Sequence, residues 1–445
     1  MLPNYISKTK PNPSSSRAPW YVNTAPSYAG IFLWVVFYEQ LAQGTLERAS
    51  PLICLLALVA AAALSYGLYY LVPALLGMKT GYPLYVVGSS TFGTTGGYVM
   101  PGLLMGLLQI GWLSVATYTA VTFILSGVGV DTAPLTPLFI ILAILWGYIT
   151  AYVGVKGIQY VARMATFVAI IPLVMILVAF FKTAGGISSY TVPNPAPVLG
   201  FTAILATVIG FFATAGAAGA DFGINSRNAS DVRLGGLVGI GLAIMIAGGL
   251  PLLSIAGAHG LNPSLEGFTY SATISSLGGF LATSMFLLFA LASVPPSCFC
   301  CFIAGNSFST MIPSVSRMSS TMVGATVAIV LAFTGVAADL VGFFNIVGAS
   351  FGPICGAMVA DYLLAGRKWA GPRPGVNYAG YGAWACGFLI GIIPFLPVSE
   401  GLKNAAQPAV VYSFVAGLVV YAVLAKAGLE PKAVSISGTD APASA

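Results

Sequence analysis

Apolar residues run along this chain in long stretches, separated by short connections that are polar or rich in glycine. Most stretches contain the roughly 20 apolar residues that an α-helix needs to cross a bilayer. No segment alternates apolar and polar residues as the strands of a membrane barrel do. The pattern therefore predicts an all-α polytopic membrane protein. Its twelve predicted spans cover residues 28–47, 51–76, 98–127, 135–153, 158–181, 199–220, 234–257, 274–296 (a continuation to 310 is left open), 320–336, 342–364, 379–398 and 407–426.

Charge divides the connections into two groups. Twelve crossings place both termini on one side of the membrane, and the tails and connections on that side hold 14 of the 17 Lys and Arg residues. Cytoplasmic loops carry the excess of Lys and Arg in membrane proteins. We therefore expect both termini in the cytoplasm and the protein in the cell (plasma) membrane.

Composition agrees with this class. Hydrophobic residues make up 58% of the chain and charged residues only 6%, against about 25% charged residues in soluble domains. The six cysteines lie in apolar runs and His259 is the single histidine, so we expect no metal or organic cofactor. The chain also lacks the metal set or acid–base pair that a membrane enzyme needs. The net charge of +6 is spread over the connections, so the expected surroundings are membrane lipid and not nucleic acid.

The first span carries polar residues that an ordinary membrane helix avoids. Glu39 lies near its middle, with Gln40 and Gln43 close by and Gly44 just beyond. A carboxylate at that depth is costly and usually faces a cavity or an ion path. The amides and Gly44 indicate a helix that breaks at mid-membrane, as in many secondary transporters. The alternative is an ordinary span in which Glu39 is protonated or paired for structural reasons.

The sixth span contains Gly210, Gly216 and Gly219, which permit either a break or very close helix packing. Spans 1 and 6 stand five helices apart, so a five-helix repeat makes the second copy inverted. Paired interruptions in two inverted repeats indicate a binding site at the membrane midplane. The predicted organisation is a cytoplasmic tail (1–27), a first repeat (28–182), an inverted second repeat (183–364), helices 11 and 12 (365–426) and a disordered cytoplasmic tail (427–445).

Candidate binding residues lie on the third and sixth spans. Gln109 and Trp112 are three residues apart and share one helix face. A tryptophan can stack on a flat ring, and a glutamine offers both a donor and an acceptor. Phe211 and Phe212 offer a second stacking face on span 6. The structural alternatives are an interfacial tryptophan, an interhelical hydrogen bond of the glutamine, and phenylalanines that fill the core.

Further candidates lie near the other helix ends. Pro295 and Pro296 are expected to kink or end span 8, and Asn306 follows in an apolar setting. Asp221 and Asp361 close spans 6 and 10 and are candidate cytoplasmic gates, with end caps and loop ion pairs as the alternative. The connection over residues 77–97 is too rich in glycine for a clean helix, which predicts a partly re-entrant loop or a short surface helix.

Three segments resemble motifs of the nucleobase–cation symport-1 family, the permeases for cytosine, purines, uracil, allantoin and hydantoins. They are GMKTGYPLYVVGSSTFGTTGGYVMP after span 2, ADFGINSRNASDV after span 6 and FFNIVGASFGPICGAMVADYLL in span 10. Their order along the chain is that of the family. The run Gln-Ile-Gly-Trp ending at Trp112 is similar to bacterial cytosine permeases.

The resemblance implies the five-plus-five inverted repeat with two additional C-terminal helices. It also implies a small planar heterocycle held between aromatic residues of spans 3 and 6. In that reading Trp112 matches the stacking tryptophan and Phe212 the aromatic position of span 6. Gln109 reads the polar edge of the ring, with Asn306 and Gln43 as further candidates.

The coupling ion stays open between H+ and Na+. Sodium-coupled relatives use hydroxyl oxygens on span 8, where this chain has Ser297 followed by Cys298, Phe299, Cys300 and Cys301. Thiols are poor ligands for a hard cation, whereas Glu39 could carry a proton. The chain is therefore predicted to import a nucleobase or related heterocycle by ion-coupled alternating access. The alternative is an amino-acid or other polar-solute symporter on the same fold.

Overall fold

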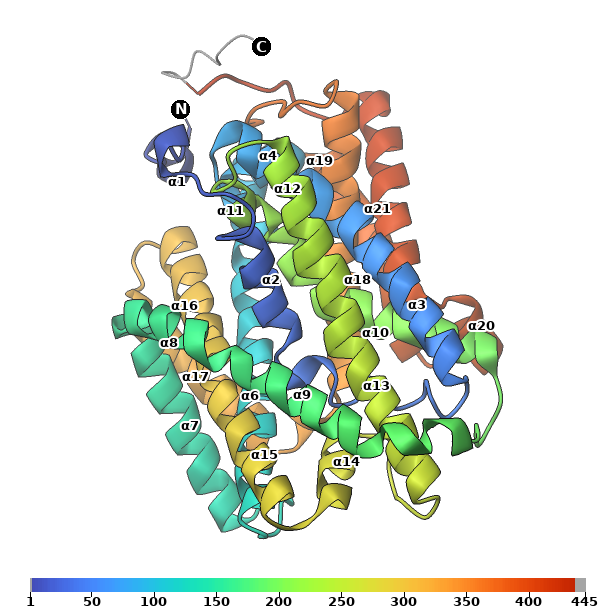
Figure 1. Ribbon diagram of the computed structural model, residues 1–445. Coiled ribbons are helices and arrows are strands. Elements are labelled where there is room, and N and C mark those ends of the chain that lie inside the picture. Colours follow the sequence, from blue (N-terminus) through green and yellow to red (C-terminus); the bar gives the residue numbers. More distant parts are fainter. Residues whose placement is uncertain (1, 437–445) are drawn as a thin grey trace.

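The computed structural model describes residues 2–436, without the side chain of Thr166. These residues form helices and connections and contain no β-strand, only one isolated bridge between Ala18 and Ser226. The helix α1 (Asn4–Ser7) lies at the same end of the molecule as the chain that follows the last helix, α21 (Ala409–Leu424), as Figure 1 shows. Both ends of the described chain therefore lie on one side of the helical bundle.

The predicted membrane class is confirmed by long apolar helices. Nine helical stretches within residues 2–436 are long and apolar enough to cross a membrane, and the helix α17 (Arg317–Phe333) is a shorter apolar one. The nine stretches are Pro51–Thr80, Gly96–Gly127, Pro137–Lys156, Ile158–Ser189, Pro197–Ala217, Ala229–Leu261, Gly279–Met311, Leu340–Leu364 and Ala409–Leu429. Their named helices are α3 (Pro51–Leu64), α4 (Leu71–Thr80), α6 (Leu104–Gly127), α7 (Pro137–Lys156), α8 (Ile158–Val168), α9 (Ile170–Thr183), α10 (Pro197–Ala217), α12 (Ala229–Gly236), α13 (Ala243–Leu261), α15 (Gly279–Ala292), α16 (Val294–Met311) and α18 (Leu340–Leu364).

The first predicted span is broken, but earlier than the sequence indicated. The helix α2 runs only from Thr24 to Phe32. Trp34 then adopts an extended conformation with ψ 127°, and the chain continues through turns as far as Ser50. Gly44 is one of these turn residues, with φ +69°, and not the site of the break. Side chains replace the lost helical bonds in this segment, since the Gln40 amide donates to the carbonyl of Ala338 at 2.9 Å.

The glycines of the sixth span serve close packing and do not break the helix. The helix α10 is continuous from Pro197 to Ala217, and only a turn at Ala218 separates it from α11 (Gly219–Gly223). A Cβ at Gly210 would lie 2.4 Å from the carbonyl oxygen of Phe344 on α18, and a Cβ at Gly216 would lie 2.7 Å from Cβ of Tyr69. The expectation of matched mid-span interruptions in spans 1 and 6 is therefore wrong for span 6.

The glycine-rich connection after α4 forms a short helix that is buried and not on the surface. The helix α5 (Leu84–Phe92) is held by the loop that follows α18, through bonds from the amides of Arg373 to Ser89 O (3.1 Å) and of Asn377 to Phe92 O (3.0 Å). Gly93 lies at φ +87°, and a Cβ there would meet the carbonyl oxygen of Gly375 at 2.3 Å. Only glycine fits this close approach of two loops.

The regions of the eighth and eleventh predicted spans are subdivided. The helix α14 (Tyr270–Leu277) is separate from α15, and Ser293 divides α15 from α16, which agrees with the expected effect of Pro295 and Pro296. The helix α16 extends to Met311, close to the continuation left open above. The helix α19 (Tyr378–Gly391) ends earlier than predicted and leads into the short helix α20 (Glu400–Ala405).

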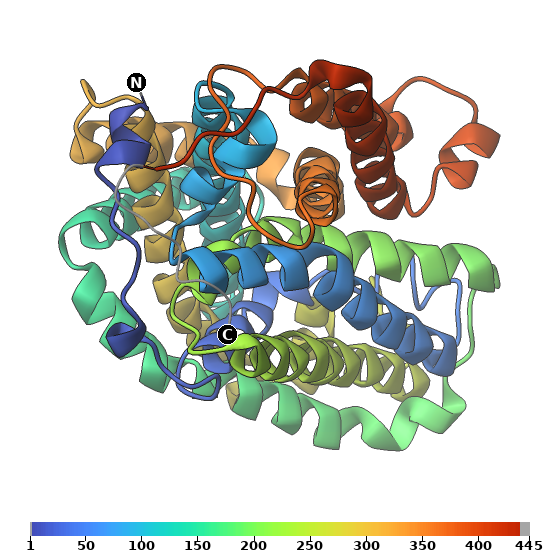
Figure 2. The same ribbon diagram turned by 90° about the horizontal axis from the view of Figure 1, so that it is seen from above.

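The predicted disordered tail is ordered as far as the structure describes it. Glu430 pairs with Arg373 at 2.5 Å, and the amide of Val434 donates to Pro372 O at 2.9 Å. The rest of that predicted tail, residues 437–445, lies outside the described residues. Seen from above, α19 and α21 group along one side of the molecule (Figure 2).

The contact between α18 and α21 gives a direct test of this packing. A Cβ at Gly356 would lie 2.1 Å from Phe414 O and 2.8 Å from Leu418 N, which are backbone atoms that cannot rotate away. We expect Gly356→Ala to separate the helices and to cost about 1–3 kcal/mol of stability, as overpacking does. The measurement is the melting temperature in detergent. Gly185→Ala is the control because nothing lies within 4 Å of its Cβ; equal melting temperatures for both variants would contradict the packing.

Candidate functional site

Trp112 of α6 lies in a cluster of aromatic rings contributed by three other parts of the chain. Only 5% of the residue is exposed. Its ring centroid lies 4.9 to 5.9 Å from those of four neighbours, within the range of aromatic pairs. The neighbours come from the break after α2, from α10 and from the start of α18, and they are Trp34, Phe211, Phe343 and Phe344.

Gln109 lies one turn before Trp112 and is also buried. Its amide nitrogen donates to the thioether sulfur of Met105 at 3.7 Å. A thioether is a weak acceptor, so most of the hydrogen-bonding capacity of this amide nitrogen is unused. The structure thus brings Gln109 and Trp112 to one buried place, as their spacing predicted.

The two phenylalanines of α10 have different surroundings. The Phe211 ring lies nearly perpendicular to that of Trp112, at 84° and 5.2 Å. The Phe212 ring instead packs under α2, at 5.6 Å from Tyr28 and 5.5 Å from Phe32. Adjacent helix residues point about 100° apart, so only one of the pair can face α6. Phe211 and not Phe212 is therefore the α10 ring that contacts Trp112.

Trp34 was not among the residues singled out from the sequence. It follows α2 at the break and is 8% exposed. Its ring lies 5.9 Å from that of Trp112. The Trp34 indole nitrogen is buried and has no hydrogen-bond partner among the described residues.

Three other predicted binding or coupling residues lie away from this cluster. Asn306 accepts a hydrogen bond from Arg317 at 3.1 Å, and Arg317 also donates to the carbonyl of Val155 at 2.6 Å. Ser297 donates to the carbonyl of Ser293 within its own helix at 2.7 Å and accepts from the indole of Trp146 at 3.2 Å. Gln43 is exposed on the turns that follow the break.

Glu39 lies beyond the break, against the N-terminus of α14. Its carboxylate accepts bonds from the backbone N–H of Ser271 at 3.1 Å and from the Ser271 hydroxyl, and its carbonyl accepts from Tyr270 N at 2.9 Å. A helix N-terminus favours a negative charge. No Lys or Arg forms an ion pair with Glu39 within residues 2–436. The carboxylate is buried, at 8% exposure, without a cationic partner in the described chain.

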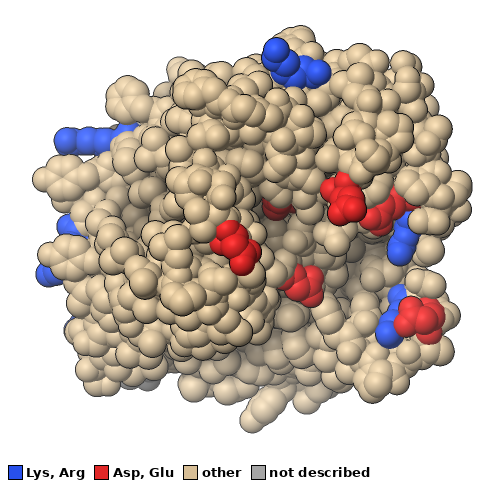
Figure 3. Space-filling view, turned by 90° about the horizontal axis from the view of Figure 1, so that it is seen from below, with Lys and Arg blue, Asp and Glu red and all other residues tan. Residues whose placement is uncertain are grey.

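The end of the molecule that carries α14 is opposite the end that carries α1 (Figure 1). Figure 3 views the molecule from below, on the side opposite α1, and there acidic side chains surround a hollow near the centre. The predicted outer connections contain four acidic residues, and the turns after the break add Glu39 and Glu47, against the three basic residues Arg48, Lys182 and Lys403. This face therefore attracts cations. The acidic residues are Glu39, Glu47, Asp131, Glu266, Asp339 and Glu400.

The two predicted gate residues both hold α5 at the opposite end. Asp221 accepts the backbone N–H of Leu84, the first residue of α5, at 3.0 Å. Burial raises the pKa of Asp221 to about 6, although the Leu84 N–H stabilises the charged form. Asp361 accepts bonds from Thr91 at 3.0 Å and Arg373 at 3.0 Å, and from the hydroxyl of Ser90.

Arg373 connects this buried network to the C-terminal segment. Its guanidinium donates to the carbonyl of Ser90 at 2.5 Å and pairs with Asp361 and Glu430. Burial opposes the positive charge, but the two carboxylates outweigh it, so the pKa of Arg373 is raised. Removing one partner of a buried ion pair is strongly destabilising. We therefore expect α5, α18 and the segment around Glu430 to stay attached to one another.

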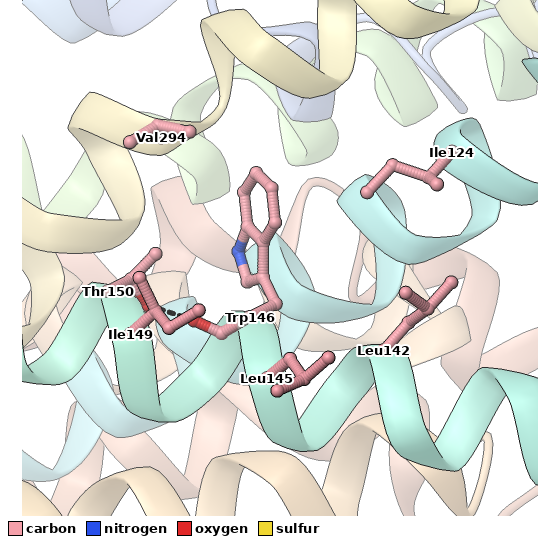
Figure 4. Close-up of a pocket in the computed structure, with 7 residues that line it drawn as sticks. All are labelled: Ile124, Leu142, Leu145, Trp146, Ile149, Thr150 and Val294. Atoms are coloured by element: carbon pink, nitrogen blue, oxygen red, sulfur yellow. Dashed lines mark hydrogen bonds between the residues drawn. The ribbon is translucent and has the colours of Figure 1, made fainter.

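The pocket in Figure 4 is lined mostly by apolar side chains, unlike the polar networks around Glu39 and Asp361. Its volume is about 260 Å³, and the Trp146 ring extends into it from α7. The Thr150 hydroxyl already donates to the carbonyl of Trp146 at 2.7 Å. A recess with this lining offers no polar group for orienting a solute. The lining residues are Ile124, Leu142, Leu145, Trp146, Ile149, Thr150 and Val294.

The family model of permeases for cytosine/purines, uracil, thiamine and allantoin matches residues 12–417 of the chain. The chain belongs to this permease family. The cytosine permeases of Escherichia coli strain K12 and of Escherichia coli O157:H7 are each 26% identical to it over 310 residues. That alignment covers 68% of this chain and 68% of each relative. The family resemblance found in the sequence motifs is confirmed, and the members of this family are permeases rather than enzymes.

Solved structures show the same fold. Mhp1, a nucleobase-cation-symport-1 family transporter, in a closed conformation with bromovinylhydantoin bound, matches this permease with a TM-score of 0.68 and 17% identity. The match covers 94% of both chains. The inward-facing conformation of Mhp1 gives a TM-score of 0.69 with 15% identity and the same coverage. A Na+-coupled sialic acid symporter in a substrate-bound outward-open state gives 0.59 with 15% identity, over 97% of this chain and 93% of its own.

Three of the rings around Trp112 in this permease were not expected from the sequence. Phe343 and Phe344 stand directly before Asn345 in the span 10 motif, and Trp34 stands five residues before Glu39. A tryptophan so close to the polar residues of a predicted broken helix was the available signal. Its contact with α6 depends on the position of the break, which the sequence placed about ten residues too late.

The partial burial of Asp221 predicts a pH effect on stability. Asp221 lies between the spans Pro197–Ala217 and Ala229–Leu261. Its pKa in the folded protein, about 6, is above the ordinary value of 3.8. The folded state therefore holds this proton more tightly, and stability falls as pH rises from about 4 through 6. We expect Asp221→Asn to lose this decline, because an amide does not titrate in this range, while its oxygen can still accept the Leu84 N–H.

Melting temperatures of the wild type and Asp221→Asn in detergent at pH 4.5 and pH 7.5 test this expectation. The predicted result is a smaller difference between the two pH values in the variant. A difference of the same size in both proteins would show that another group titrates.

Proposed function

We propose that this permease imports a planar heterocycle of the nucleobase class by ion-coupled alternating access. The observation that carries the proposal is the buried aromatic cluster around Trp112, with the underused amide of Gln109 one turn away. An aromatic face binds a flat ring of any base by stacking, and an amide adds a donor and an acceptor at the ring edge. Membership of the family supports the substrate class.

Stacking requires the cluster to open. A ring between two parallel aromatic faces needs them about 7 Å apart, twice the contact distance of ~3.5 Å. The centroids of Trp112 and Phe211 are 5.2 Å apart, and those of Trp112 and Phe344 are 5.5 Å apart. Entry of the heterocycle therefore requires at least one ring to rotate. Phe211 is our preferred opposing ring; Phe212 would reach the ligand only if α10 turned.

The proposed topology is twelve membrane helices with both termini in the cytoplasm. Residues 28–182 and 183–364 form two inverted repeats of five helices, and residues 365–426 supply two further helices. The likeness of fold to Mhp1 and the family motifs support this layout. The concentration of Lys and Arg in the tails and connections on the side of the termini supports the orientation.

Glu39 is our candidate for coupling to a proton. As an anion it accepts two hydrogen bonds at the N-terminus of α14 and benefits from the helix dipole. Protonation removes the charge and one acceptor, which loosens the broken first helix from α14. The proton would thus act on the broken segment at Glu39. The ligand would bind beside the same segment, since Trp34 lies 5.9 Å from Trp112. Sodium is the alternative, with Ser297 as a hydroxyl ligand, but that hydroxyl is already bonded to Ser293 and Trp146.

Uptake of labelled cytosine, uracil, hypoxanthine and allantoin by cells that produce the protein tests the substrate class. We expect uptake of at least one of them, and we expect Trp112→Ala to weaken its binding about 5- to 150-fold, because stacking on one base is worth about 1–3 kcal/mol. The amount of protein in the membrane is measured for each variant. If correctly inserted wild type takes up none of the four bases and takes up amino acids instead, the proposal is overturned in favour of an amino-acid symporter.

The pH dependence of uptake tests the role of Glu39. Proton coupling predicts that wild-type uptake rises as pH falls from 8 to 5 without a need for sodium, and that Glu39→Gln loses this dependence. Glu47→Gln is the matched control, since Glu47 lies on the same segment and its carboxylate accepts the Gly44 N–H at 3.1 Å, a bond that the amide oxygen of Gln can still accept. Strict sodium dependence with no effect of pH, unchanged in Glu39→Gln, would rule out the proton.

A further inference from the structure

The indole N–H of Trp34 is unusual among the tryptophans of this protein. It is buried, in a side chain with 8% exposure, and no protein atom among residues 2–436 accepts its hydrogen bond. Three other indoles donate normally, at 3.0 to 3.2 Å. They are Trp146 to the Ser297 hydroxyl, Trp369 to Val87 O and Trp384 to Ser350 O. A buried donor without an acceptor is costly to a fold, and such groups in native proteins often have a functional reason.

The backbone fixes where this donor lies. Trp34 is the first extended residue after α2, and its own backbone N–H donates to Ile31 O at 3.3 Å. Val35 and Val36, which follow it, are fully buried. The backbone that carries the Trp34 ring is therefore anchored among buried residues, and the ring itself is 8% exposed. This constraint keeps the indole against Trp112, at a centroid distance of 5.9 Å.

Trp34 complements the two groups already assigned to the ligand. Trp112 offers a face, and Gln109 offers an amide that can both donate and accept. The indole of Trp34 can only donate. A ligand stacked on Trp112 would therefore meet the indole donor of Trp34 on the side of the broken helix. The ligand must present an acceptor to this donor, or the donor stays unpaired.

We propose that the Trp34 N–H donates a hydrogen bond to an in-plane acceptor of the transported heterocycle, a ring nitrogen or a carbonyl oxygen. The proposal rests on the proposed function and adds a specificity rule to it. Bases with an acceptor at that edge bind, and analogues with C–H at the same position are rejected. Sites that hydrogen-bond a substrate discriminate strongly against analogues that lack the group, because the protein donor is then left unpaired.

The test combines a protein change with a ligand change. Trp34→Phe keeps an aromatic ring and removes the N–H. Trp384→Phe is the matched control, because it removes an indole N–H whose bond is to the backbone of α18. Binding to purified protein is measured for the base that the wild type takes up and for two sets of analogues. In the deaza analogues one ring nitrogen is replaced by C–H. In the deoxo analogues one carbonyl is removed.

We expect Trp34→Phe to weaken binding of the natural base about 3- to 10-fold, the effect of one hydrogen bond. One analogue should bind wild type and Trp34→Phe equally, because its missing atom is the acceptor of this bond. Trp384→Phe should match wild type for every ligand. Equal weakening of the base and all analogues by Trp34→Phe, or no weakening, would overturn the role of the N–H. Failure of the wild type to bind any base would instead overturn the proposed function, and this rule with it.

A spectroscopic measurement keeps the proposal falsifiable if Trp34→Phe does not fold. The chain has six tryptophans, and 15N-tryptophan labelling gives a separate indole signal for each. Trp34→Tyr, which lacks the indole N–H, assigns the signal as the one that disappears. We expect the Trp34 indole proton to shift downfield when the natural base binds and to stay in place with the analogue that lacks the acceptor. An unmoved signal at saturating base would contradict the hydrogen bond.

Discussion

The interruption of the first helix between Leu33 and Trp34 is the constraint on which the rest of the site depends. Unpaired backbone in a membrane must find partners inside the protein. Here the amide of Gln40 reaches Ala338, before α18, and the carbonyl of Glu39 accepts from Tyr270, at the start of α14. The broken segment is therefore attached to two other parts of the chain. Its position turns Trp34 toward α6 and Glu39 toward α14, so the segment after the break carries an aromatic ring to one neighbour and a carboxylate to another.

Two polar anchors occupy opposite ends of the molecule. At one end Glu39 binds the N-terminus of α14, and at the other Asp361 and Arg373 hold the buried helix α5. Alternating access needs contacts that form on one side while they open on the other. The two anchors differ in strength. Within the described part of the chain the carboxylate of Glu39 has neutral donors only, whereas Asp361 has an arginine that is itself paired with Glu430. We infer that the α14 end is the more easily opened.

The sequence predicted the class, the family and the buried pair Gln109 and Trp112, because hydropathy, motif order and helical spacing are local properties. It predicted that the first helix breaks, but it placed the break near Gly44. No glycine or proline stands at Leu33 or Trp34, and the true position depends on partners far along the chain. The resemblance assigned the aromatic position of span 6 to Phe212, whereas Phe211 is the ring that contacts Trp112. The rotation of α10 is set by its packing on α18 through Gly210 and is not visible in the sequence. The hydrogen bond of Asn306 was not predicted for a related reason. Its partner Arg317 lies across the turn between α16 and α17 and is not visible in spacing.

The central claim is that a planar heterocycle binds against Trp112 beside the broken first helix. A map of the purified protein with its tightest-binding base, at a resolution that shows ring orientation, tests it most directly. The account predicts a flat density stacked on Trp112, with Phe211 rotated away from its present contact and the Gln109 amide and Trp34 indole at hydrogen-bond distance from the ring edge. Base density elsewhere, with Trp34, Phe211 and Trp112 still in mutual contact, would contradict it.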